Sequence, residues 1–364
     1  MRSLAVTALA VFLGAGCSRR PEQPALARAA HYLWSQQAPD GSWPSHTYGL
    51  LRSGQALTPF VLEALLQVPD TAYPRPVAKI DRAIEFIRRN TNADGALGTM
   101  DPGLPDYPNY ATALAVSAIC QARRPGWQQQ VAPMVACLLH QQFDEQKGWK
   151  RDDAPYGAWG MGGIEHPPPN PGHVDLSMTR YVLQALRAAG VQPDNPAFAH
   201  ARIFVERCQN YDPKHPADTD GGFFFSTTEF DTNKAGHDGQ HFRSYGTTTA
   251  DGILALLAIG RPVDDERVLA AKRWLTTHHR DMAVPGFIGE AYHRWPHGLA
   301  FYYAAACTQA FHLLKVPMDS AIPDALRHSQ RADGSWSNPE NLVKEDDPFI
   351  ATGFSVRAIV ASSY

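Results

Sequence analysis

The chain has 364 residues, of which 44% are hydrophobic, and this is enough apolar material for a large core in one or two domains. Its formal net charge is only -3. A protein that binds nucleic acid usually has a strong positive field, because the phosphates are negatively charged. This composition lacks such a field, so we expect no nucleic-acid partner.

The first residues have the features of an export signal. The apolar run Leu4 to Leu13 is too short to span a membrane as a helix. Small residues directly before Cys17 are typical of a bacterial lipoprotein signal, in which that cysteine becomes the lipidated N-terminus. Gly14 stands where such signals usually have a large apolar residue, so simple secretion is the alternative. We expect residues 1–17 to be the signal peptide, 18–24 a tether, and the protein to be periplasmic or cell-envelope bound, with Cys17 as its membrane anchor.

Residues 25–364 alternate between two kinds of helical segment. Amphipathic segments such as 25–37 and 79–91 are each followed, after a loop, by mostly apolar segments such as 57–68 and 110–122. The further pairs are 127–143 with 174–189, 195–210 with 247–259, 265–279 with 296–314, and 321–330 with 349–362. One amphipathic helix cannot cover an apolar partner, so the apolar helices must gather inside a ring of the others. The pattern predicts one domain, an all-α (α/α)6 toroid of six helical hairpins.

The same short motif, Q-x-x-D-G-S-W, ends the first and the last amphipathic helix, at residues 37–43 and 330–336. Its Asp-Gly pair forms a tight turn that the Trp can cover. In a closed ring the first and last hairpins are neighbours, so we predict that the chain ends meet and that Trp43 and Trp336 are buried. Weaker copies of the turn are assigned to Gly95, Gly148, Gly221 and Gly286.

These turns resemble the QW repeats of squalene-hopene cyclases and the repeats of protein prenyltransferase β subunits. Other strings are similar to successive motifs of bacterial exported proteins in this superfamily, most of which lack an assigned activity: 175–179, 220–223, 243–249 and 298–303. The resemblance covers almost the whole chain after the export segment and implies the toroid fold. It says little about the reaction, because one fold hosts many chemistries.

The catalytic sets of these two families are not complete in this chain. The nearest string to the D-x-D-D acid of the cyclases is 218–220, which lacks the fourth-position acid and lies at a repeat turn. The zinc set of the prenyltransferases requires an Asp and a Cys two residues apart, and the sequence contains no D-x-C. We therefore predict no metal and no cofactor, and the sequence does not decide whether the protein is an enzyme.

Polar residues concentrate in the loops that lead into the apolar helices, and these loops open at one end of such a barrel. His241, Arg243 and Tyr245 alternate, which in an extended segment places them on one face. We predict that Arg243, Tyr245, Asp175 and His297 face one cavity, and these four with His241 are the candidate catalytic groups. The candidate ligand-binding residues are Phe223, Phe225, Arg243, Tyr245 and Tyr302.

The leading functional hypothesis is an exported toroid that binds a small hydrophobic ligand, an isoprenoid or a lipid, in its central cavity. The alternatives are a divergent terpenoid cyclase, a glycan-active enzyme like a polysaccharide lyase, and a non-enzymatic scaffold. An apolar cavity would favour the first hypothesis, an open cleft with His241, Arg243 and Tyr245 the glycan hypothesis, and a filled cavity the scaffold. Alternatively, Arg243 pairs with Asp238 or Asp251 and only staples its loop.

Overall fold

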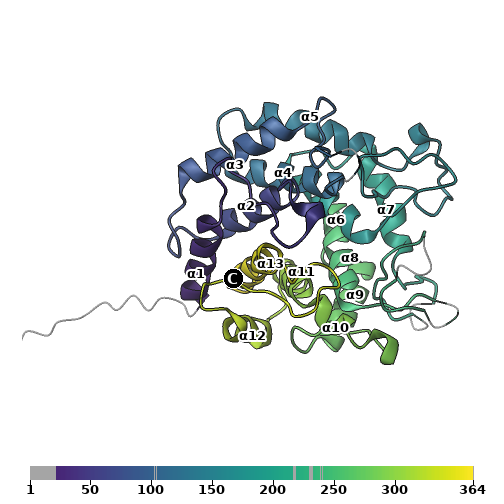
Figure 1. Cartoon of the computed structure of the whole chain (residues 1–364). Coiled ribbons are helices and arrows are strands. Elements are labelled where there is room, and N and C mark those ends of the chain that lie inside the picture. The colour runs from purple at the N-terminus through teal and green to yellow at the C-terminus, as the bar shows by residue number, and fades with distance from the viewer. Residues whose placement is uncertain are drawn as a thin grey trace, which may run out of the picture.

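The computed structural model describes residues 22–363, apart from 102, 104, 216–218, 229–232, 238 and 240. The predicted signal peptide and Cys17 lie outside this part of the chain. The regular secondary structure of the described residues is helical (Figure 1). None of the helices described is both long enough and apolar enough to cross a bilayer.

Each of six hairpins pairs an outer helix with an inner one, which confirms the predicted all-α toroid. The outer helices are α1 (Glu22–Ser35), α3 (Val77–Asn90), α5 (Trp127–His140), α7 (Pro196–Arg207), α9 (Glu266–His278) and α12 (Ala321–Ser329). The inner helices are α2 (Leu57–Gln67), α4 (Pro108–Ala122), α6 (Leu176–Ala188), α8 (Gly246–Ala258), α11 (Ala300–Leu313) and α13 (Pro348–Ser362). The short helices are η1 (Gly49–Leu51), η2 (Glu145–Lys147), η5 (Glu290–Tyr292) and α10 (Trp295–Gly298).

The inner helices form a closed ring in which each packs against the next and α13 packs against α2 (Figure 1). Helix α2 is buried along almost its whole length, whereas α3 buries one stripe and turns Arg88 and Arg89 to solvent. This difference follows the sequence pattern, because an apolar surface on every side is stable only inside the ring.

The repeat turns join neighbouring hairpins and close the ring. Trp43 and Trp336 are both 0% exposed, which confirms their predicted burial. Gln330 donates a hydrogen bond from Nε2 to the Ala25 carbonyl oxygen of α1 over 3.0 Å, so the last turn holds the first outer helix. Side-chain amides of Gln37, Gln142 and Gln209 likewise reach the next outer helix, at Lys79, Ala197 and Arg267.

The third repeat turn is at Gly157, and its assignment to Gly148 is wrong. Gly157 has φ 87°, and a Cβ there would lie 2.0 Å from the His200 carbonyl oxygen of the next outer helix, so no other residue fits. Trp159 follows this turn and donates from Nε1 to the Leu138 carbonyl oxygen over 2.6 Å. Gly148 only ends the short helix η2. An insertion before the turn separates it from its helix, and the Gly-Trp pair inside the insertion imitates the motif.

Candidate functional site

A cavity of about 350 Å³ lies where the inner helices begin, and all six hairpins contribute to its wall. This volume is in the range of small-molecule sites. The apolar part of the wall consists of Leu51, Ala56, Leu57, Phe60, Leu114, Met161, Leu299, Leu342, Val343, Ile350 and Phe354. Because the centre of the ring is hollow, the structure does not match the filled barrel that the scaffold hypothesis expects.

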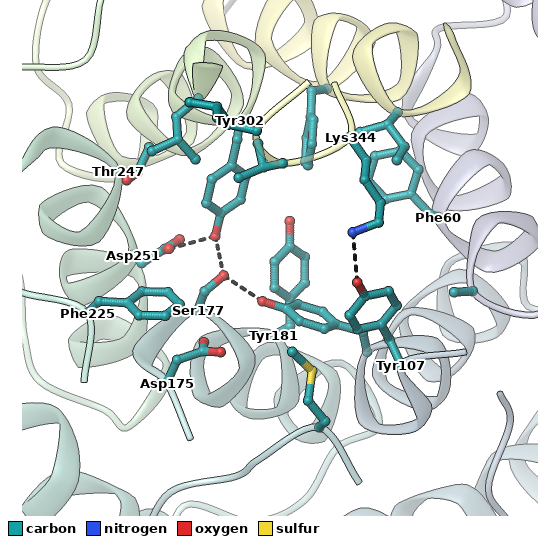
Figure 2. Close-up of a pocket in the computed structure, with 18 of the residues that line it drawn as sticks. Phe60, Tyr107, Asp175, Ser177, Tyr181, Phe225, Thr247, Asp251, Tyr302 and Lys344 are labelled. Atoms are coloured by element: carbon teal, nitrogen blue, oxygen red, sulfur yellow. Dashed lines mark hydrogen bonds between the residues drawn. The ribbon is translucent and has the colours of Figure 1, made fainter. Parts of the chain in front are cut away.

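A chain of hydroxyl groups crosses the polar part of the wall and ends at a carboxylate (Figure 2). Tyr110 of α4 donates to Ser177 Oγ of α6 over 2.8 Å, and Ser177 bonds to the Tyr302 hydroxyl of α11. Tyr302 donates to Asp251 Oδ2 of α8 over 2.6 Å. Since the Tyr302 proton is committed to the carboxylate, Ser177 is the donor to Tyr302. The hydroxyl protons of the chain therefore all point toward Asp251.

Asp251 also forms a buried ion pair with Arg180 of α6. The Nε of Arg180 lies 3.0 Å from Asp251 Oδ1, and the two side chains are 4% and 1% exposed. Arg180 further donates from Nη1 to Gln184 Oε1 and lies 4.0 Å from the centroid of the Tyr181 ring. Burial raises the pKa of Asp251, while Arg180 and the Tyr302 hydrogen bond oppose that rise. This carboxyl is therefore satisfied by the protein on both of its oxygens.

A second polar cluster surrounds the Phe225 ring. Asp175 caps α6 by accepting the Met178 amide at 2.7 Å through Oδ1, and its Oδ2 lies 2.8 Å from His173 Nε2. The centroids of the His173 and Phe225 rings are 5.7 Å apart. Lys234 Nζ lies 3.4 Å from the centroid of the Phe225 ring, and the loss of water around this amine lowers its pKa to about 8. His173, Asp175 and Lys234 all line the cavity.

The loop before α13 brings one more amine to the cavity. Lys344 donates from Nζ to the Tyr107 hydroxyl over 3.0 Å, as Figure 2 shows. The next residue, Glu345, turns away from the cavity and accepts the amides of Phe301 and Tyr302 at 3.1 and 2.7 Å, which caps α11. Burial raises the pKa of Glu345 to about 7. This cap fixes the loop that carries Lys344.

Four of the predicted site residues line the cavity: Asp175, Phe225, Tyr245 and Tyr302. Tyr245 is almost completely buried, and burial raises the pKa of its phenol well above the usual range. Phe223 does not line this cavity. Its amide donates to Thr249 Oγ1 and its ring packs on Gly252, so it occupies the place that Trp43 has in the first repeat turn.

The other three predicted residues lie elsewhere. His241 and Arg243 line a separate hollow of about 720 Å³, beside Asp220 and Trp274. His297 is exposed and belongs to the wall of neither space. The set predicted for one cavity is therefore divided, because Tyr245 begins helix α8 and packs into the core whereas Arg243 stays in the loop.

Asp251 is the partner of Arg180, which removes one of the two partners considered for Arg243, and Asp238 lies outside the described residues. Asp220 accepts the Gly222 amide and the Ser244 hydroxyl, as expected of a turn residue.

In the described part of the chain, His, Cys, Asp and Glu side chains form no group of three or more suited to a metal ion.

The comparisons with known proteins identify the architecture. No protein-family model matches the sequence, and no curated protein matches it. Among solved structures, the type II terpene cyclase MstE from Scytonema is 14% identical, with a TM-score of 0.60 over 93% of this chain and 97% of that chain. A D-mannose isomerase is 12% identical, with a TM-score of 0.58 over 93% and 96%. A GH76 α-mannanase from Bacteroides thetaiotaomicron is 10% identical, with a TM-score of 0.53 over 92% and 94%.

These likenesses extend over nearly the whole of each chain, at identities that show a shared fold and not a shared activity. The names of these proteins refer to a terpenoid in one case and to mannose or mannan in the other two. The chain is thus similar in structure to the terpenoid-cyclase type of all-α toroid, and its chemistry has to be argued from its own cavity.

Proposed function

We propose that the toroid binds an amphipathic small molecule, with an isoprenoid-like or lipid-like apolar body, in its central cavity. The observation that carries the proposal is the division of the cavity wall into an apolar part and a polar part. Apolar surface releases water when a ligand covers it, and the few polar groups would orient that ligand. The volume of about 350 Å³ lies at the lower end of the range of small-molecule sites.

The cavity supports this proposal better than a divergent cyclase. A general acid that protonates an alkene must hold its own proton. Asp251, the carboxyl at the end of the hydroxyl chain, is paired with Arg180 and accepts from Tyr302. Burial raises the pKa of Asp251, but both of its oxygens already have protein partners, which leaves neither oxygen free to protonate a ligand. A solved structure of an MstE variant contains the substrate geranylgeranyl dihydroxybenzoate. This complex is compatible with an isoprenoid ligand in this fold.

The glycan hypothesis has less support from the same cavity. It places His241, Arg243 and Tyr245 around the carboxylates of one substrate. The first two line the separate hollow and Tyr245 lines the central cavity. Sugar-binding sites also need free hydrogen-bond donors and acceptors, and the hydroxyl chain from Tyr110 to Asp251 is already internally paired.

Export and membrane attachment through Cys17 are part of the proposal. A lipid anchor would hold the cavity near a membrane, from which an amphipathic ligand could be taken. The Cys17→Ala variant tests this: it should move from the membrane fraction to the soluble fraction with an unchanged fold. Equal membrane retention of both proteins would contradict the anchor.

Ligand binding is tested by filling the cavity. Ile350 lines it from the first turn of α13, so Ile350→Trp should occupy the space with little loss of stability. Native mass spectrometry and solvent extraction of the purified protein should find an apolar molecule with the wild type and lose it with Ile350→Trp. Val77→Trp is the matched control, because Val77 is 51% exposed on the outer helix α3. Proteins that retain nothing, or retain the same molecule equally in all three forms, would overturn the proposal.

A further inference from the structure

Lys234 is a cavity cation whose neighbours are aromatic rings, with no counter-ion among the residues that the structure describes. It lies in the loop between α7 and α8 and lines the cavity, where Nζ contacts the face of the Phe225 ring. The Trp295 ring is the next nearest, at 5.9 Å. Nζ makes no ion pair or hydrogen bond within the described ranges, and an ammonium in such surroundings lacks much of its hydration. Its accessible surface faces the cavity, so a ligand can reach it.

The carboxylates that face Lys234 are engaged elsewhere. Asp175 binds His173 and the Met178 amide, and Asp251 binds Arg180 and Tyr302. Both carboxylates are close enough to raise the pKa of Lys234, while burial lowers it by more, and the result is a pKa of about 8. Lys234 is therefore mostly charged at neutral pH, with no carboxylate bound to it.

Hydrogen-bond donors for a ligand are scarce on the same wall. The protons of Tyr302 and Ser177 point along the chain to Asp251, and Thr248 donates to the Phe223 carbonyl oxygen. Lys344 gives one of its protons to the neutral Tyr107 hydroxyl. Lys234 and Lys344 are the two ammonium groups in the cavity lining, and Lys234 is the one with no hydrogen-bond acceptor among the described residues, so a ligand group that carries negative charge would gain most there.

We infer that Lys234 anchors the carboxylate of the amphipathic ligand, whose apolar body lies against the walls of hairpins one and six. This inference rests on the proposed function and names the ligand class as a monocarboxylate, such as a fatty or isoprenoid acid. A phosphate dianion is a poorer match, because it calls for several donors or an arginine fork, and Arg180 is already paired. The Phe225 ring at 3.4 Å and the Trp295 ring at 5.9 Å from the amine would help to exclude water from the ion pair.

The test compares two probes of equal chain length, decanoate and decanol, by isothermal titration calorimetry at pH 7. Both probes are small amphipathic molecules that differ only in the head group. The wild type should bind decanoate at least about tenfold more tightly than decanol, as expected of a hydrogen bond to a charged group. Lys234→Met should remove that preference and leave decanol binding unchanged. The preference of the wild type should also decline as the pH rises above about 8, where the amine loses its proton.

Lys344→Met is the matched control, because it removes the same charge from another part of the same cavity. Its loss of decanoate affinity should be clearly smaller than that of Lys234→Met. Equal losses would mean that the overall field of the cavity and not an anchor at Lys234 selects the anion, and the inference would be wrong. Equal binding of both probes by the wild type would also overturn the inference while leaving the proposed function standing. Binding of neither probe would overturn both.

Discussion

Hairpins one and six give the central cavity a different wall from hairpins three and four. The first pair contributes Leu, Ala, Ile, Val and Phe side chains, with Lys344 as the exception. The second pair contributes His173, Asp175, Lys234 and Asp251, and Arg180 lies directly behind them. The two pairs also differ in their connections, because residues 141–175 and 208–245 form the two longest loops inside a hairpin.

This comparison shows how a repeat fold acquires a site. The repeat turns share a Gly, and in hairpins one, three, four and six a Gln also reaches the next outer helix, so the same turn occurs in hairpins with and without ionisable groups in the cavity. The ionisable groups come from the long loops and from single positions at the start of inner helices, which the repeat does not constrain. The apolar half therefore consists mainly of the repeat itself, and the polar half carries additional ionisable side chains that face the cavity.

The largest expected effect tests the buried pair of the polar half. Arg180→Met leaves the Asp251 carboxylate buried without its cation, and such a loss costs about 3–5 kcal/mol. The double variant Arg180→Met with Asp251→Leu removes both charges and should recover most of this stability. Urea unfolding measures the three free energies. Equal destabilisation in the single and double variants would show that packing, and not the unpaired charge, causes the loss.

The matched change in the apolar half is Lys344→Met. Lys344 is bonded to a neutral hydroxyl and leaves no opposite charge behind, so its removal should cost about 1 kcal/mol or less. A loss as large as that of Arg180→Met would remove the distinction between the two walls.

The next effect concerns the buried carboxyl of each half. Asp251 has a permanent cation beside it, whereas the partners of Glu345 among the described residues are amide donors, from Phe301, Tyr302 and Asn338. Burial raises the pKa of Glu345 from 4.5 to about 7, so the folded protein keeps a proton that the unfolded chain has released. The stabilisation is complete below about pH 4.5 and is lost as the pH rises to about 7, by about 3 kcal/mol in total.

Glu345→Gln cannot ionise and should lack this pH-dependent contribution to the free energy of unfolding. The difference between the unfolding free energies of Glu345→Gln and the wild type should therefore shift in favour of the variant between about pH 4.5 and 7, and stay constant above. Glu290→Gln, at an exposed position, is the control and should leave the pH profile unchanged. A pH-independent difference for Glu345→Gln would contradict the raised pKa.

The fold could be predicted from the sequence because its signals are local and repeated. Helical periodicity placed all twelve helices of the six hairpins within a few residues, and two copies of one motif predicted the ring closure. The third turn was misplaced, since an insertion set Gly157 apart from its helix and a Gly-Trp pair at Gly148 imitated the motif. Spacing along the chain cannot show which of two glycines approaches a neighbouring helix.

The site was only partly predictable. Asp251 carries a signal that the sequence offered, because it is a charged residue inside a helix that is otherwise apolar and mostly buried. Arg180 does not, because with Gln184 and Arg187 it forms a polar stripe at helical spacing, which is typical of an exposed face. Lys234 carries none, since it lies in an irregular loop without periodicity. The alternation of His241, Arg243 and Tyr245 was present, but tertiary packing draws Tyr245 into the core and leaves the other two at a separate hollow.

The smallest expected effect compares the packing of the two halves at equivalent glycines. Gly252 of α8 and Gly353 of α13 each lie against a phenylalanine ring: a Cβ would come within 2.3 Å of Phe223 and 2.4 Å of Phe60, respectively. Phe223 is fully buried in the repeat turn and cannot move without disturbing it. Gly252→Ala should therefore destabilise the protein by about 1–3 kcal/mol, as overpacking does.

Phe60 has space to move, because its ring lines the cavity. In Gly353→Ala the ring can turn into that space, and the better helix propensity of Ala returns up to about 1 kcal/mol, so the net change should be within about 1 kcal/mol. The displaced ring would narrow the cavity, so Gly353→Ala should weaken decanoate binding while Gly252→Ala leaves binding per folded molecule unchanged. Urea unfolding and titration measure the two effects on the same samples. If Gly353→Ala costs as much stability as Gly252→Ala and binds decanoate as the wild type does, Phe60 is fixed like Phe223, and the apolar half is a packed wall with no freedom to adapt to a ligand.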